Sequence, residues 1–184
     1  MELCANVTVR YGDKRVLNNV TLAVPQGGVT WLSGPSGVGK TTLLRVLAGL
    51  VKPETGAVTL PGRGVMLFQE DRLFPRLSAL DQVLSVLPRQ RRGEAAKWLE
   101  LVGLSDAANL APEKLSGGMA RRVALARALA VEGEVYLLDE PFAGVDLERS
   151  QRILTRLCDL GRTVVVTGHE NQLAGLCHHT VELS

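Results

Sequence analysis

The segment from Gly34 to Thr41 reads Gly-Pro-Ser-Gly-Val-Gly-Lys-Thr and constrains the fold more than any other part of the sequence. It matches the pattern G-x-x-x-x-G-K-[ST], which needs a preceding strand and a following helix to place its groups on a phosphate. Both are predicted, because the mostly apolar run 29–33 leads into the segment and residues 41–50 have helical spacing. Strand, loop and helix in this order predict an α/β core with a phosphate-binding loop.

In such a loop, glycines let backbone N–H groups wrap a polyphosphate, and the helix N-terminus adds positive potential. Lys40 is expected to reach the outer phosphates, and the hydroxyl of Thr41 is expected to ligate Mg²⁺. The alternative, a flexible glycine-rich turn, is disfavoured by the flanking strand and helix. The candidate nucleotide-binding residues of this loop are Gly34, Pro35, Ser36, Gly37, Val38, Gly39, Lys40 and Thr41.

Two other regions show the patterns of strands. Apolar residues alternate over 3–9 and over 20–24, and Tyr-Gly-Asp-Lys at 11–14 predicts a turn between two antiparallel strands. The runs 56–60 and 65–68 flank Pro-Gly-Arg-Gly at 61–64, which is typical of a hairpin or a tight connection. The chain is expected to begin with an antiparallel β-subdomain.

The rest of the chain alternates between helical and strand patterns. Apolar residues recur at three and four from about residue 75 to 131, with interruptions at prolines and at a Gly-Gly pair. Short apolar runs at 135–138 and 163–167, separated by a helical segment at 146–160, predict parallel strands with a crossover helix. We expect one domain over 1–184, with an α/β core of mainly parallel sheet at 1–69 and 119–184 and an inserted α-helical lobe at 70–118.

Composition limits the partners of the chain. Its 46% apolar and 22% charged residues are typical of a folded domain. The formal net charge of +2 provides no large positive field, so nucleic acid is not expected as a partner. No run is apolar for long enough to span a bilayer, and the N-terminal residues lack the pattern of a signal peptide. The chain is therefore expected in the cytoplasm.

Three cysteines, without Cys-x-x-Cys spacing, are expected to be small buried side chains.

An acidic pair follows the apolar run 135–138. The order would place Asp139 at the carboxyl end of a strand in the same sheet, beside the phosphate loop, with Glu140 next to it. One carboxylate can hold Mg²⁺ and the next can polarise an attacking water, because phosphoryl transfer needs metal, positioning and a base. Such a pair is weak evidence alone and strong evidence after a phosphate loop.

A second glycine-rich turn, Leu-Ser-Gly-Gly-Met at 115–119, precedes a predicted helix that runs to Ala130. Ser116, Gly117 and Gly118 lie where helix N–H groups point outward at an anion, so they would form a second phosphate-binding surface. The alternative is an ordinary serine N-cap with a glycine-rich turn. The turn by itself favours that alternative.

Taken together, these motifs resemble the ATP-binding cassette (ABC) ATPases. The resemblance rests on 34–41, Gln69, 115–118, 135–140, Asp146 and His169, in this order and with a helical lobe between the first and the third. It covers essentially the whole chain and implies a P-loop NTPase core. The Leu-Ser-Gly-Gly stretch discriminates most, because other P-loop proteins such as small kinases lack it.

The resemblance implies that ATP is held in a head-to-tail dimer, between the Gly34 loop of one copy and the Ser116 turn of a second copy or of a paralogous ATPase. Tyr11 would stack on adenine, and Lys40 and Thr42 would contact phosphates. From the residues alone, Tyr11 is expected to be a turn residue.

The resemblance also implies roles in the chemistry. Thr41, Gln69 and Asp139 would serve Mg²⁺ or the water near it. Glu140 would be the general base, and His169 would be the γ-phosphate sensor. From the residues alone, His169 is expected to be a strand-end histidine. Asp146 would belong to a loop that communicates across the dimer.

Some residues depart from the family pattern. Met119 stands where glutamine is usual, Ala-Gly-Val-Asp at 143–146 replaces the common Ser-Ala-Leu-Asp, and Glu170 stands where aspartate is usual. None of these changes removes a group expected to touch phosphate.

The leading hypothesis is the motor subunit of a transporter, more similar to importers than to exporters. Membrane subunits would dock in a cleft beside Gln69, near Leu73 and Phe74, and would keep the protein at the inner face of the cell membrane. Leu73 and Phe74 would otherwise fill the core of the lobe itself.

Two other functions fit the sequence less well. A cassette acting on ribosomes or DNA would need tandem cassettes, a coiled coil or a basic arm. A small-molecule kinase has no use for the Ser116 turn.

Overall fold

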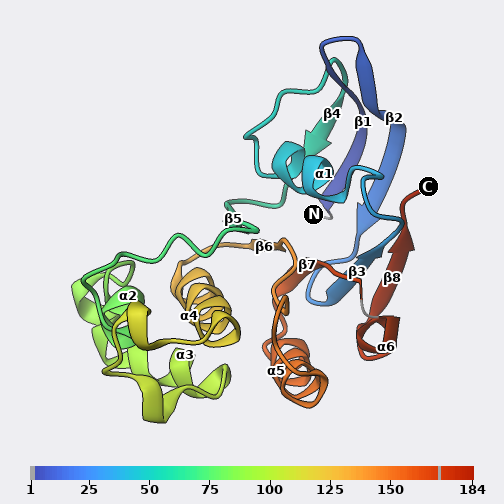
Figure 1. Ribbon diagram of the computed structural model, residues 1–184. Helices are drawn as coiled ribbons and strands as arrows, with labels where there is room; N and C mark the ends of the chain where they lie inside the picture. Colours follow the sequence, from blue (N-terminus) through green and yellow to red (C-terminus); the bar gives the residue numbers. More distant parts are fainter. Residues whose placement is uncertain (1–2, 170) are drawn as a thin grey trace.

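The computed structural model describes residues 3–169 and 171–184, which form two β-sheets with helices around them (Figure 1). Glu170 lies outside the described residues. Strand β1 (Leu3–Tyr11) pairs antiparallel with β2 (Lys14–Val24) and with β4 (Thr55–Thr59). Tyr11 pairs with Lys14 across the turn, so the predicted antiparallel β-subdomain is confirmed. Cys4 points to the outer face of β1 and is exposed, so the expectation of a buried thiol was wrong there.

The second sheet is parallel, with strand order β5-β6-β7-β3-β8. Its strands are β3 (Val29–Ser33), β5 (Gly64–Leu67), β6 (Val135–Leu138), β7 (Thr163–Thr167) and β8 (His179–Glu182). This order confirms the α/β P-loop fold. Of the two connections considered for 61–64, the hairpin was wrong, because β4 and β5 belong to different sheets. The Arg63 N–H donates to Glu134 Oε2 at 2.6 Å, and the Glu134 N–H donates to the Arg63 carbonyl at 3.0 Å, which draws β5 to β6.

Helices cover both faces of the parallel sheet (Figure 1). Helix α1 (Lys40–Leu47) packs with the antiparallel sheet on one face, while α4 (Gly117–Ala130) and α5 (Leu147–Asp159) pack on the other. Helices α2 (Ala79–Leu84) and α3 (Ala95–Leu101) pack against α4. The same part of the chain contains 3₁₀ turns at Arg89–Glu94, Ser105–Ala107 and Pro112–Lys114, of which the first two contact α3. The short α6 (Asn171–Ala174) lies against β3 and α5.

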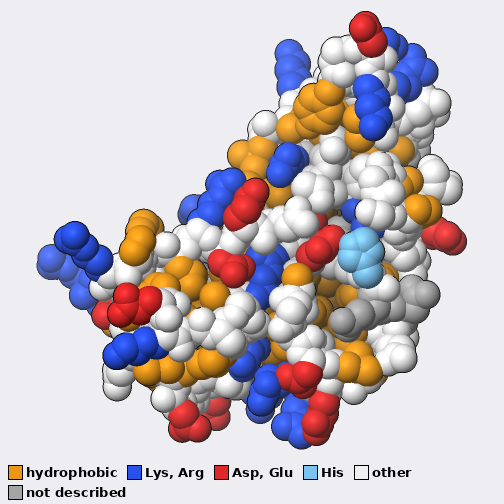
Figure 2. All heavy atoms as spheres, viewed as in Figure 1, with side chains coloured by type: hydrophobic (Ala, Val, Ile, Leu, Met, Phe, Trp, Pro, Cys, Tyr) orange, Lys and Arg blue, Asp and Glu red, His pale blue; other side chains and the backbone are white. Residues whose placement is uncertain are grey.

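The surface is mixed in character. On the face in Figure 2, acidic and basic side chains are interspersed, and apolar side chains are exposed between them. Among residues 3–169 and 171–184, no helix combines the length and the apolarity that a bilayer span requires.

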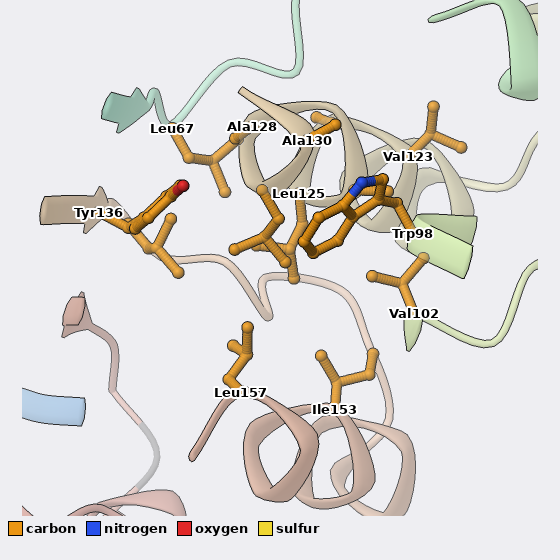
Figure 3. Close-up of a cluster of buried hydrophobic side chains, with 14 of the residues drawn as sticks. Leu67, Trp98, Val102, Val123, Leu125, Ala128, Ala130, Tyr136, Ile153 and Leu157 are labelled. Atoms are coloured by element: carbon orange, nitrogen blue, oxygen red, sulfur yellow. The ribbon is translucent and has the colours of Figure 1, made fainter. Parts of the chain in front are cut away.

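Alternation along the buried strands divides the core into two clusters. Tyr136 and Leu138 of β6 pack toward α4 and α5, whereas Val135 and Leu137 pack toward α1. Figure 3 shows the first cluster, in which Trp98 from α3 and Leu157 from α5 meet side chains of α4 and β6. Because successive side chains of a strand point to opposite faces, one short apolar run can support helices on both sides.

Candidate functional site

The phosphate loop lies between β3, which ends at Ser33, and α1, which begins at Lys40. Gly34 and Gly39 have φ angles of 141° and 111°, which only glycine adopts without strain. A Cβ at Gly34 would lie 2.4 Å from the carbonyl oxygen of Leu183, so a larger residue would push the loop away from the residue that follows β8. Gly39 is the N-cap of α1 and makes no side-chain cap, which leaves the first N–H groups of the helix free to bind an anion.

Lys40 crosses this loop. Its Nζ donates to the carbonyl oxygens of Gly34 at 2.7 Å and of Pro35 at 2.9 Å, and the residue is 7% exposed. The ammonium group is therefore held where the loop curves, among backbone groups. A phosphate oxygen placed in the loop would meet a fixed positive charge.

Asp139 lies at the end of β6, as the sequence predicted. Its Oδ1 accepts hydrogen bonds from the hydroxyl of Thr41 at 3.1 Å and from the hydroxyl of Thr167 at 2.9 Å. Its Oδ2 is buried and has no hydrogen-bond partner among the described residues. A buried carboxylate oxygen without a partner is costly, and a cation or a cation-bound water would satisfy it. The predicted metal-site residues Thr41 and Asp139 are thus in contact.

Glu140 and His169 form a pair at the carboxyl ends of β6 and β7. His169 Nε2 lies 2.9 Å from Glu140 Oε1. The backbone of Glu140 has a φ of 48°, which is uncommon outside glycine, and its N–H donates to the hydroxyl of Thr167 at 3.0 Å. Strained backbone of this kind clusters at functional sites, where the surrounding structure maintains it. Here it directs the carboxylate of Glu140 toward His169.

A cavity of about 260 Å³ brings most of the predicted residues together. Val16 also lines it and was not predicted, because it reaches the cavity through the packing of β2 across the phosphate loop and no local pattern marks it. The lining residues are Val16, Ser36, Gly37, Gly39, Lys40, Thr41, Thr42, Gln69, Glu140 and His169.

Other predicted residues lie outside the cavity lining. Gly34, Pro35 and Val38 belong to the loop, and Asp139 lies buried beneath it. Tyr11 is 48% exposed at the turn between β1 and β2, as expected for a turn residue.

Ser116, Gly117 and Gly118 also lie apart from the cavity, at the start of α4. Ser116 is the N-cap, and its Oγ accepts from the backbone N–H of Met119 at 3.2 Å. Ser116 and Gly117 are exposed, and a Cβ at Gly118 would lie 2.4 Å from the carbonyl oxygen of Gly144. The serine N-cap considered from the sequence is present, and the turn that follows faces solvent.

Asp146 caps α5. Its carboxylate accepts from the Arg149 N–H at 3.0 Å and from the Arg149 guanidinium at 2.8 Å. The backbone N–H of Arg149 is the main cause that lowers the pKa of Asp146, and the charge of Arg149 adds to it. The structure therefore assigns Asp146 a capping role, and communication across a dimer stays a prediction.

The fold and this site define a P-loop protein of the cassette type, and comparison with known proteins agrees. Residues 17–143 match the family model described as ABC transporter. The chain belongs to the ABC transporter family.

Two solved structures cover the whole chain at 30% identity: the cassette MJ0796 in a dimeric post-hydrolysis state bound to ADP and Pi, with a TM-score of 0.88, and a second dimeric structure of MJ0796, described as a bacterial ABC transporter cassette, with a TM-score of 0.87. The chain covers 94% of each of these chains.

Similar curated proteins are importer components. The chain is 47% identical over 152 residues to an aliphatic sulfonates import ATP-binding protein of Nocardia farcinica, with 82% of this chain and 62% of the relative covered. It is 42% identical over 165 residues to the sulfate/thiosulfate import ATP-binding protein of Escherichia coli, with 78% and 45% covered. The chain therefore spans about half the length of the curated relatives it matches.

Proposed function

We propose that this chain binds ATP in the cavity at the phosphate loop and hydrolyses it to power transport across a membrane, in the direction of import. The contact between His169 Nε2 and Glu140 Oε1, 2.9 Å long, supports hydrolysis most directly, because both groups line the same cavity as Lys40. A carboxylate and an imidazole beside a phosphate site are suited to orient a water and accept its proton. The relatives described as import ATP-binding proteins support the direction.

In this proposal the triphosphate lies along residues 34–39, where free N–H groups of the loop and of α1 bind its oxygens. Lys40 exchanges its carbonyl contacts for the outer phosphates, and Thr42 lies at the same cavity wall. Glu140 accepts the proton of the attacking water, and His169 orients the terminal phosphate. Tyr11, exposed at the turn between β1 and β2, stacks on the base.

The site also fits Mg²⁺. Asp139 Oδ2 is a buried acceptor without a partner among the described residues, and the Thr41 hydroxyl bonds the other oxygen of the same carboxylate. Gln69, whose side chain carries an amide oxygen, also lines the cavity. Oxygen donors of this kind suit Mg²⁺, which when bound supplies positive charge against the phosphate oxygens.

The Ser116 turn supports a head-to-tail dimer with a second copy or with a paralogous ATPase. Ser116 and Gly117 are exposed at the N-terminus of the long helix α4, yet the cavity of the same chain does not include them. A second chain could present this turn to the ATP bound by the first. The dimeric structures of MJ0796 are consistent with such an assembly.

A groove on the lobe side supports docking of membrane subunits, which would hold the protein at the cytoplasmic face of the membrane. Its volume is about 210 Å³, and β5, the segment after it and α4 line it. Phe74 nearby is 52% exposed, whereas Leu73 packs against the core. Of the two roles considered from the sequence, filling the lobe core suits Leu73 and contacting a partner suits Phe74, so Phe74 is the candidate contact.

Two further expectations belong to this proposal. The chain is one domain, with its core at 1–69 and 119–184 and its helical lobe at 70–118, and nucleic acid is not its partner.

Phosphate release from ATP by the purified chain tests the proposed function. We expect Mg²⁺-dependent hydrolysis that Glu140→Gln removes, while both proteins bind ATP in calorimetry. Arg92→Gln, an exposed change on the lobe, is the matched control and should hydrolyse ATP like the parent. Absence of both ATP binding and hydrolysis in the parent would contradict the proposal.

A further inference from the structure

Arg121 is a buried cation that has no role in the proposed ATP hydrolysis. It lies in the second turn of α4, and 2% of its surface is exposed. A buried guanidinium is costly unless acceptors surround it, so its contacts indicate what it holds.

One side of the guanidinium binds the turn that carries the proposed base. Arg121 Nε donates to the carbonyl oxygen of Glu140 at 3.0 Å, and Nη2 donates to the carbonyl oxygen of Asp139. Both contacts are to backbone, so Arg121 leaves the two carboxylates free for the cavity.

The other side binds the segment that carries Gln69. Arg121 Nη1 donates to the carbonyl oxygens of Phe68 at 2.7 Å and of Gln69 at 3.1 Å. The same nitrogen lies 3.0 Å from Asp71 Oδ1. One planar fork therefore joins two segments that are far apart in the sequence.

The sheet explains why such a bridge is needed. Strands β5 and β6 are paired as far as Leu67 and Leu138, and the Asp139 N–H donates to the Leu67 carbonyl at 3.1 Å. Among the described residues, no backbone hydrogen bond joins the two segments beyond that point. Arg121 continues the connection where the ladder ends, and it does so beneath Gln69 and Glu140.

We propose that Arg121 is a positioning residue that sets the place of Gln69 relative to Glu140, and so aligns the water-binding groups of the site with the base. The inference rests on the proposed ATP hydrolysis. Arg127, also on α4, donates to the carbonyl oxygens of Asp71 at 2.8 Å and of Arg72 at 3.0 Å. Helix α4 thus holds the whole segment 68–72, which also lines the lobe-side groove.

Arg122 provides a matched control on the same helix. It is 5% exposed and donates to the carbonyl oxygens of Val102 and Gly103, both at 2.9 Å. Its third hydrogen bond, from Nε to the Gly118 carbonyl at 3.2 Å, stays within α4. Its contacts to other segments are comparable to those of Arg121, but they end in the lobe. A loss of fold stability should follow from changing either arginine, whereas misalignment of the site should follow only from changing Arg121.

Steady-state ATP hydrolysis and ATP calorimetry on Arg121→Lys, Arg121→Gln and Arg122→Lys test the role. A lysine keeps the charge but cannot reach both segments at once. We expect both Arg121 variants to lose about ten- to a hundredfold in kcat, the scale of a misplaced reacting group, with ATP Kd within about threefold of the parent. Arg122→Lys should keep kcat within about threefold, even where thermal unfolding shows a similar loss of Tm. Parent-like kcat in Arg121→Lys, or an equal loss of kcat in Arg122→Lys, would overturn the proposal.

A double-mutant cycle with Gln69→Ala keeps the inference testable if Arg121→Gln folds poorly. If Arg121 acts by placing Gln69, Arg121→Lys should lower kcat by a clearly smaller factor in the Gln69→Ala background than in the parent. Fully additive losses would contradict the positioning role. A parent that neither binds nor hydrolyses ATP would instead refute the proposed function, so the two failures are distinguishable.

Discussion

The Gly34 loop and the Ser116 turn have similar local chemistry and very different surroundings. Both are glycine-containing turns at the N-terminus of a helix, α1 in one case and α4 in the other. The Gly34 loop opens into a cavity that Gln69, Glu140 and His169 also line. The Ser116 turn is exposed, and its serine side chain already caps the N–H of Met119.

The difference teaches that a helix N-terminus becomes a site through its neighbours. The carboxyl ends of β3, β6 and β7 meet around the Gly34 loop, because parallel strands all end at the same edge of the sheet. No comparable edge surrounds Ser116 among the described residues. In the proposed function, the first turn therefore binds ATP within one chain, whereas the second takes part only when a partner presents it.

The largest expected effect comes from Glu140→Gln, which keeps size and hydrogen bonding but removes the proposed base. We expect kcat to fall by about a hundredfold or more while ATP still binds. Undiminished hydrolysis would contradict the role of Glu140. Because ATP then persists, the variant should also accumulate as an ATP-dependent dimer, measured by size-exclusion chromatography with light scattering. A persistent monomer at high concentration, also with the membrane subunits added, would contradict the head-to-tail dimer.

Lys40→Ala removes the cation of the Gly34 loop. We expect ATP affinity to fall by about ten- to a hundredfold, the usual range for losing a charge-assisted hydrogen bond. Calorimetry with ATP measures the change. Equal affinity in Lys40→Ala and the parent would show that backbone N–H groups alone account for binding, and would make the Gly34 loop chemically more similar to the Ser116 turn.

Ser116→Arg, combined with Glu140→Gln, tests the second turn. It adds bulk and a misplaced charge to the opposing surface, so the ATP-dependent dimer should weaken by about tenfold or more. ATP binding to the monomer should stay within about twofold, because Ser116 lies outside the cavity. Light scattering and calorimetry give the two values. A loss of monomer binding instead of dimerisation would place Ser116 in the first site.

Tyr11→Ala has the smallest expected effect. Losing one exposed stacking contact should weaken ATP and GTP alike by roughly three- to tenfold. Competition binding with both nucleotides measures this. A changed preference between the bases at unchanged ATP affinity would indicate recognition of a base edge and not stacking.

Sequence patterns sufficed where the chemistry is local. Gly34 to Thr41 predicted both the loop and its helix, and the acidic pair after β6 predicted that Asp139 lies beside this loop, where it bonds Thr41. The same patterns missed Val16 and gave no reason to single out Arg121. Both matter only through packing of distant segments, which no local spacing encodes.

By itself, the sequence determined the order of elements, the alternation that buries the strands and the candidate phosphate-binding groups, because each depends on residues a few positions apart. Only the tertiary structure decided that β4 and β5 separate into different sheets, that Leu73 turns inward while Phe74 faces solvent, and that Arg121 joins the segments of Gln69 and Glu140. These features depend on where β5, β6 and α4 meet, and that meeting depends on the burial of side chains across the whole fold.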